Sequence, residues 1–126
     1  PIELAVAGDA HGTWDLTRIS RVAANLVSNA LQHGGGGTIR ISVDGRAPDI
    51  VRFAVSNAGV IPADLLPTIF EPFRKGSTSK HKGLGLGLFI VREITAAHGG
   101  KVGVTSALDT GTSFVVELPR HVPLAS

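Results

Sequence analysis

The stretch NLVSNALQH, residues 25–33, places Asn25 and Asn29 four residues apart in a segment with helical periodicity. At that spacing the two side chains share one face of a helix. Asparagine is less favourable than alanine inside a helix by roughly 0.5–0.7 kcal/mol, so two asparagines on one face suggest a functional role. Their amide oxygens suit Mg²⁺, which prefers oxygen ligands shared with phosphates and water. The alternative is that both amides simply face water.

The helix that carries these asparagines is expected over 15–33, with Asp15 as its N-cap and glycines 34–37 at its end. On either side, short or alternating apolar runs bounded by turn residues predict strands, and two further segments predict helices. The predicted strands are 2–7, 38–43, 50–55, 101–106 and 113–118, and the further helices are 63–70 and 85–97. Strands interleaved with helices in this order favour a single α+β domain over residues 1–126.

A glycine-rich run, Gly83-Leu84-Gly85-Leu86-Gly87-Leu88, leads directly into the second long helix. Each glycine would cost about 1 kcal/mol relative to alanine inside a helix, so we expect the run to form a closely packed loop that leads into the helix. The backbone N–H groups of such a loop and the positive end of the following helix can bind phosphate. The run is neither a P-loop nor a complete dinucleotide-binding fingerprint. A flexible hinge is the alternative.

The segment before the glycine-rich run is basic and contains no acidic residue. It holds Arg74, Lys75, Lys80, His81 and Lys82. A basic segment immediately before a phosphate-binding turn is the arrangement expected of a lid over a triphosphate. The alternative is an ordinary solvated loop. A nucleic-acid surface is disfavoured because Phe73 is the sole aromatic residue beside the run.

The turn at residues 56–62, SNAGVIP, follows a predicted strand. A polar side chain at the end of a strand, followed by glycine, can hydrogen-bond the edge of a base in a pocket. Taken alone, this feature favours a plain turn.

The composition fits one globular domain, with 43% hydrophobic residues among 126 and a formal net charge of +2. The charge is too mild to indicate nucleic-acid binding. The absence of cysteine excludes disulfides and thiolate metal sites. The chain does not begin with methionine, so we expect a piece excised from a longer protein. No apolar run approaches the ~18–20 residues of a membrane span, and no signal peptide is visible.

Together these segments resemble the ATP-binding catalytic domain of sensor histidine kinases, whose superfamily also holds DNA gyrase, Hsp90-type chaperones and MutL. The N box matches residues 25–33, the F box 69–73, the second glycine box 83–88 and the last glycine box 106–114. Four boxes in this order cover nearly the whole chain. The resemblance implies a two-layer α/β sandwich of the Bergerat type, with a mixed sheet covered on one face by about three helices.

The resemblance also implies how the domain would bind Mg-ATP. Asn29 would be the Mg²⁺ ligand, Asn25 would lie beside the phosphates, and Lys75 or another lysine of the lid would reach the γ-phosphate. ATP hydrolases of the superfamily often carry glutamate at the position of Asn25. Its absence fits a kinase, in which the nucleophile is an imidazole and no water needs activation.

Further nucleotide contacts follow from the same boxes. Phe70 and Phe73 would anchor the lid, and Thr112 would lie by the adenine. The nucleotide-binding residues implied in full are Asn29, His33, Asn57, Gly59, Ile61, Phe70, Phe73, Lys82, Gly83, Leu84, Gly85, Leu86, Gly87, Leu88 and Thr112.

One box departs from the pattern. The first glycine box is usually Asp-x-Gly-x-Gly, with the aspartate accepting a hydrogen bond from the adenine amino group. Here Asn57-Ala58-Gly59 occupies it and the second glycine is absent. An asparagine oxygen can still accept that bond, although without charge, so we expect a weaker one. Similar N-x-G-x-I-P sequences resemble bacterial kinases of the bacteriophytochrome type.

The phosphoacceptor histidine is expected outside this chain. A phosphoacceptor would be followed by an acidic residue and usually a nearby proline, and none of the five histidines has that context: His11, His33, His81, His98 and His121. The implied partners are a dimerisation and phosphoacceptor domain, N-terminal in the same full-length chain, and a response regulator receiver domain. The domain would be cytoplasmic and monomeric as a fragment, within a homodimeric full-length protein.

The sequence leaves two alternatives to histidine phosphorylation. A degenerate domain of the same fold could bind nucleotide without transferring phosphate, and the change at Asn57 supports that alternative. An ATPase or serine kinase of the superfamily is the other, and asparagine at position 25 argues against hydrolysis.

Overall fold

The computed structural model describes residues 2–33, 36–72 and 82–121, excluding the side chains of residues 82–85. Five strands form one sheet in the order β1-β2-β3-β5-β4. The strands are β1 (Ile2–Gly8), β2 (Ile39–Gly45), β3 (Ile50–Asn57), β4 (Lys101–Ala107) and β5 (Gly111–Pro119). β1 is parallel to β2, and the other neighbours are antiparallel. The predicted mixed sheet is therefore confirmed, with each predicted strand within about two residues of its place.

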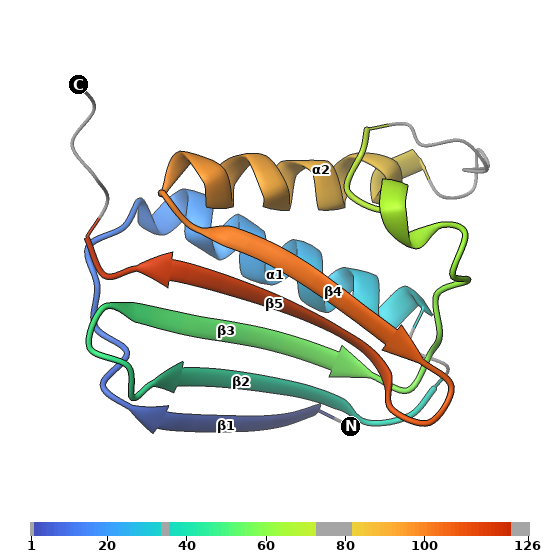
Figure 1. Ribbon diagram of the computed structural model, residues 1–126, viewed down its shortest axis with the longest axis horizontal. Coiled ribbons are helices and arrows are strands. Elements are labelled where there is room, and N and C mark those ends of the chain that lie inside the picture. Colours follow the sequence, from blue (N-terminus) through green and yellow to red (C-terminus); the bar gives the residue numbers. More distant parts are fainter. Residues whose placement is uncertain (1, 34–35, 73–81, 122–126) are drawn as a thin grey trace.

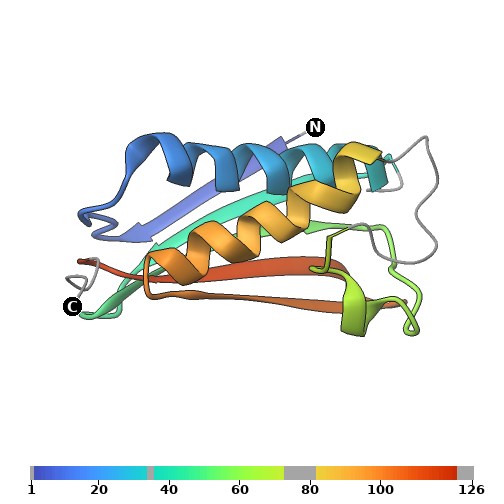
Figure 2. The same cartoon turned by 90° about the horizontal axis from the view of Figure 1, so that it is seen from above.

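Two α-helices, α1 (Leu16–His33) and α2 (Lys82–Ala97), cover one face of the sheet, and the other face is free of helices in the described part of the chain (Figure 2). The helices run in opposite directions, so α1 ends beside the start of α2 (Figure 1). This arrangement confirms a two-layer α+β sandwich. Among the described residues, neither helix is long and apolar enough to cross a lipid bilayer.

The core lies between this helical layer and the sheet. α1 contributes Val22, Leu26 and Ala30, which recur every four residues, and α2 contributes residues at similar spacing. Alternate residues of β3 and β5 face them, while the intervening residues point to the open face. The buried core residues are Val22, Leu26, Ala30, Ile39, Val55, Ile69, Leu88, Val91, Ile94, Phe114, Val116 and Leu118.

The third helical segment, expected over 63–70, contains a single turn of 3-10 helix at Leu66–Thr68. Pro67 lies inside this turn and cannot donate a backbone hydrogen bond. Its ring also disfavours α-helical backbone at Leu66, so a longer α-helix does not form. On the edge strand β1, the side chains of Ile2, Leu4 and Val6 are more than half exposed.

The glycine-rich run differs from the expectation of a loop, because α2 begins at Lys82 and its first turns contain Gly83, Gly85 and Gly87. Leu88 and Val91 are almost fully buried and fix the helix against the sheet. Propensity is a weak preference that tertiary packing often overrides, and here the helix extends upstream from its packed part despite the glycines.

Two side chains fix the end of the domain where α1 starts. His98 Nε2 accepts the backbone N–H of Asp15 at 3.2 Å, so its Nδ1–H donates to the carbonyl of Ile94 at 2.9 Å. Arg120 donates to four backbone carbonyls at 2.7–3.0 Å, and these belong to His11, Gly45, Ala47 and Pro48. The N-terminus of α1 is thereby tied to α2 and to the β2–β3 turn.

Candidate functional site

The candidate site lies at the opposite end of the domain, where α1 ends, α2 begins and β3 ends (Figure 1). The turn between β4 and β5 reaches the same end. Segments that are distant in sequence therefore meet there, and they carry the two asparagines, the glycine-rich run and the turn at 57–61.

The two asparagines of α1 have different surroundings. The side chain of Asn25 donates from Nδ2 to the backbone carbonyl of Gly87 on α2, at 3.2 Å. Asn29 is 8% exposed, and its amide has no hydrogen-bond partner among the described residues. Among the described residues, Thr95 Oγ1 is the one side-chain polar atom that is cut off from solvent without a partner, so the amide of Asn29 keeps some contact with solvent and stays accessible to a ligand. Asn29 is therefore the side chain here that could supply an oxygen to a ligand or a cation.

The residues of this site could hold Mg²⁺ through one protein ligand, the amide oxygen of Asn29. The described residues contain no cluster of three or more His, Cys, Asp or Glu side chains that could hold a metal ion by themselves. Mg²⁺ usually keeps several waters and shares its remaining ligands with substrate phosphates, so one amide oxygen suffices on the protein side.

The turn after β3 is held by the side chain of Asn57, which is 7% exposed. Its Oδ1 accepts the backbone N–H of Gly59 at 2.9 Å, which closes an Asx turn. A Cβ at Gly59 would lie 2.1 Å from the carbonyl oxygen of His33, the last residue of α1. Glycine at 59 therefore lets this turn pack directly against the end of α1.

A chain of hydrogen bonds joins the same turn to β4 and β5. The N–H of Ile61 donates to Ser106 Oγ at 2.8 Å, and Ser106 Oγ lies 2.8 Å from Thr112 Oγ1. Thr112 in turn donates to the carbonyl of Gly59 at 2.8 Å. Thr112 is also the cross-strand partner of Asn57, and both are buried. Sequence reasoning gave no separate role to Ser106, although the last glycine box begins at this residue.

The F-box residue Phe70 packs its ring edge-on against Phe114, with centroids 5.9 Å apart and planes at 84°. Ile69 beside it is buried in the core. The segment before the predicted lid is therefore attached to β5. Phe73 and Lys75 lie outside the described residues.

The structure thus brings together most of the residues that the sequence singled out. Asn25, Asn29, His33, Asn57, Gly59, Ile61, Phe70, Gly87 and Thr112 lie at this end of the domain. Leu86 is half-buried at the start of α2, whereas Leu88 faces the core. Gly83 and Gly85 belong to the first turns of the same helix, as do Lys82 and Leu84, whose side chains are not described.

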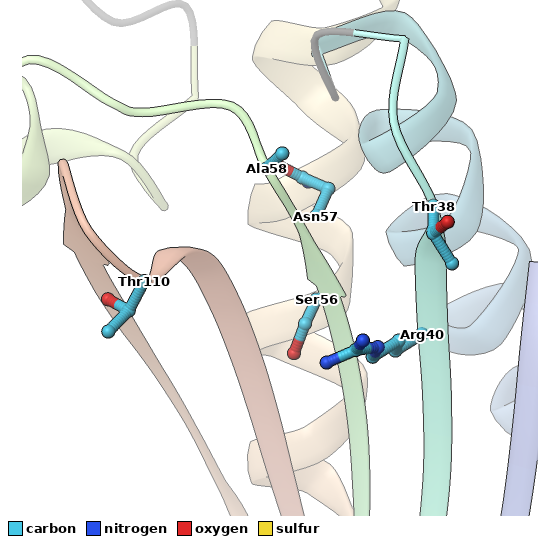
Figure 3. A pocket seen from close by; sticks show the side chains of 6 residues that line it. All are labelled: Thr38, Arg40, Ser56, Asn57, Ala58 and Thr110. Carbon is cyan, nitrogen blue, oxygen red and sulfur yellow. The ribbon is translucent and has the colours of Figure 1, made fainter.

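A cavity of about 260 Å³ lies near the site but on the other face of the sheet (Figure 3). It is lined by Thr38, Arg40, Ser56, Asn57, Ala58 and Thr110. Arg40 and Ser56 are cross-strand partners and alternate with residues that face the helices. The cavity is therefore separated by the sheet from Asn29 and from the buried hydroxyl of Thr112.

The fold and the residues gathered at this end define a class of nucleotide-binding domain. Residues 14–122 match the family model described as histidine kinase-, DNA gyrase B- and HSP90-like ATPase, and the chain belongs to this family.

Within that family, the chain is similar to sensor histidine kinases. It is 36% identical over 121 residues to the signal transduction histidine-protein kinase AfsQ2 of Streptomyces coelicolor, covering 94% of this chain and 22% of that protein. It therefore spans about a fifth of the length of this curated relative.

Solved structures of histidine kinases are also similar to this chain. The catalytic domain of the histidine kinase ThkA in a nucleotide-free form superposes with a TM-score of 0.78 at 35% identity, covering 95% of this chain and 81% of that one. Full-length ShkA in complex with AMPPNP superposes with a TM-score of 0.75 at 31% identity, covering 98% of this chain and 27% of that one.

Proposed function

We propose that this domain binds Mg-ATP and transfers the γ-phosphate to a histidine on a separate dimerisation and phosphoacceptor domain. The observation that carries the proposal is the pairing of two half-sites at one end of the domain. Asn29 offers an amide with no side-chain partner among the described residues, and the Asn57 turn forms a hydrogen-bonded polar cluster with Thr112 of β5. One half-site suits the phosphates with their cation, and the other suits a base.

The phosphate half-site would work by positioning and electrostatics. Asn29 would supply an oxygen to Mg²⁺, which bridges the phosphate oxygens and neutralises charge that develops during transfer. The first backbone N–H groups of an α-helix have no acceptor within the helix, so the start of α2 would offer them to a phosphate. Lys75 and Lys82 would add positive charge to the γ-phosphate. Asn25 would keep α1 and α2 in register through its bond to Gly87.

The base half-site would recognise the purine through Asn57 and Thr112, with Gly59 and Ile61 held beside them by hydrogen bonds. Support for ATP as the nucleotide comes from the family and from ShkA, a similar protein solved with AMPPNP.

Transfer to histidine rests on two features of the chain. The homologous kinases are much longer than this chain, so the phosphoacceptor domain and a response regulator receiver domain would lie outside it. Position 25 carries an amide that is already bonded to α2, and an amide cannot act as a general base toward water. We place the domain on the cytoplasmic side, where ATP is available to a kinase.

The test has two stages. Titration calorimetry of the domain with ATP, with Mg²⁺ and with excess chelator, should show binding that is stronger with the metal. The domain is then mixed with labelled ATP and a separately produced phosphoacceptor helix bundle from its own full-length protein. Label on a histidine of that bundle is the expected result, whereas ATP binding without any transfer would leave a nucleotide-binding module and reject the kinase.

A further inference from the structure

The protons of the hydrogen-bond chain at the base half-site can be assigned. The carbonyl of Gly59 can only accept, so Thr112 uses its one hydroxyl proton there, at 2.8 Å. The bond between Ser106 and Thr112 must then take its proton from Ser106. Ser106 in turn accepts the N–H of Ile61. The chain therefore runs in one direction, from Ile61 through Ser106 and Thr112 to Gly59.

Ser106 occupies the centre of this chain and joins three separate segments. It lies near the end of β4, Thr112 lies near the start of β5, and Ile61 belongs to the turn after β3. Bonds in a directional chain polarise and strengthen one another, so each hydroxyl holds its neighbour more firmly than it would alone. The turn at 57–61 is thereby held at its middle, where Gly59 bonds Asn57 and Thr112, and at its end, where Ile61 bonds Ser106.

The assignment also determines which hydrogen bond Thr112 can make with a ligand. Thr112 has given its proton to Gly59 and has taken one from Ser106, so one acceptor lone pair remains on its oxygen. A ligand atom that meets this hydroxyl must therefore be a donor, such as an amino group or a bound water. Because the Thr112 hydroxyl is already oriented in the free protein, less conformational entropy is lost when the nucleotide binds.

We propose that Ser106 is a positioning residue for nucleotide binding, which holds Thr112 and the turn at 57–61 in the shape that receives the base. This inference rests on the proposed function and deepens it, because it assigns the preformed geometry of the base half-site to one hydroxyl group. Ser106 acts through Thr112 and Ile61, and it leaves the phosphate half-site at Asn29 unchanged.

The test compares three variants that keep the backbone of the strands. Ser106→Ala removes the central hydroxyl, and Ser106→Thr restores one at the same place. Ser113→Ala is the matched control, because Ser113 is also half-buried and also bonds another hydroxyl, that of Ser56 at 3.0 Å, but on the open face of the sheet. Each protein is titrated with Mg-ATP and with inorganic tripolyphosphate plus Mg²⁺, which probes the phosphate half-site without a base.

Ser106→Ala should bind ATP about two- to tenfold more weakly, the range expected for loss of a net hydrogen bond. Its affinity for tripolyphosphate should stay within about twofold of wild type, and the amide of Ile61 should exchange faster with solvent. Ser106→Thr and Ser113→Ala should behave like the wild-type protein toward both ligands.

Three results would overturn the inference: unchanged ATP affinity in Ser106→Ala, an equal loss for ATP and tripolyphosphate, or the same loss in Ser113→Ala. A wild-type protein that binds tripolyphosphate but not ATP would instead reject the proposed function. The two failures are therefore distinguishable.

Discussion

Asn25 on α1 donates a hydrogen bond from Nδ2 to the backbone carbonyl of Gly87 on α2, at 3.2 Å. This bond connects the two helices at the edge of the glycine-rich run, where glycine weakens α2 most. The amide therefore serves first as a donor between helices, and its oxygen remains for a ligand.

The donor role of Asn25 predicts that two small substitutions differ in their effect on stability. Asn25→Ala loses the bond but gains helix propensity, so the free energy of unfolding should change by less than about 1 kcal/mol. Asn25→Asp places a carboxylate against the carbonyl of Gly87, and the free energy of unfolding should fall by about 1–3 kcal/mol at pH 7. Urea denaturation of the three proteins measures both effects. Equal stability of Asn25→Asp and wild type would contradict the donor role.

The unpaired amide of Asn29 predicts a loss of function without a loss of stability. Asn29→Ala should bind Mg-ATP at least about tenfold more weakly and should abolish phosphotransfer, because Mg²⁺ loses its protein ligand. The free energy of unfolding should not fall, since alanine is the better helix former. Ser28→Ala, an exposed neighbour on the same helix, serves as the control. Phosphotransfer by Asn29→Ala at the wild-type rate would remove Asn29 from the metal site.

The Asx turn at Asn57 determines which atom of the Asn57 side chain can contact the base. Oδ1 is held by the N–H of Gly59, so rotating the amide would cost that bond, and Nδ2 is the atom left to meet a carbonyl on a purine. Asn57→Asp keeps the bond to Gly59 and exchanges Nδ2 for an oxygen. We expect ATP to bind up to about tenfold more tightly, and GTP more weakly, because charge-assisted bonds are about twice as strong as neutral ones.

Titration calorimetry with ATP and GTP on wild type and Asn57→Asp checks this prediction. Ala58→Asp adds the same charge at an exposed neighbouring position and controls for the general electrostatic effect. The ATP/GTP affinity ratio should rise in Asn57→Asp and stay near the wild-type value in Ala58→Asp. An unchanged ratio in Asn57→Asp would mean that Asn57 does not face the base.

A row of alternating charges on the open face of the sheet, called here the charge ladder, predicts that the stability of the fold decreases in acid. Asp44, Arg52, Glu117 and Lys101 are successive cross-strand partners of alternating sign. The hydrogen bond from Arg52 lowers the pKa of Glu117 below its ordinary value, and Arg46 lowers the pKa of Asp44 to about 2. Because folding lowers both pKa values, the ladder stabilises the fold above the unfolded pKa values of about 4, and the contribution is lost as pH falls toward 2.

Arg52→Gln should therefore raise the pKa of Glu117 toward its ordinary value while leaving that of Asp44 near 2, since Arg46 remains. NMR titration of the two carboxyl groups measures both values in one experiment. The melting temperatures of wild type and Arg52→Gln should differ most above pH 5 and converge toward pH 2. An unshifted pKa of Glu117 would show that Arg52 does not bond it in solution.

The sequence by itself determined the elements and the chemistry of several residues. Alternation in 38–43 and 50–55 predicted β2 and β3, and the helical spacing of Leu26 and Ala30 predicted α1, because each pattern reflects a contact made every two or every three to four residues. The motifs also singled out Asn29, Asn57 and Thr112 as candidate site residues, and their roles stay predictions.

The tertiary structure decided everything that depends on residues distant in the chain. The order β1-β2-β3-β5-β4 pairs Asn57 with Thr112, 55 positions away, and the bonds of Ser106 and of Asn25 depend on that arrangement. Local propensity also misplaced the start of α2, where packing of Leu88 and Val91 outweighs three glycines. Local periodicity records which face of an element is buried, whereas the partner on that face is set by the packing of the whole domain.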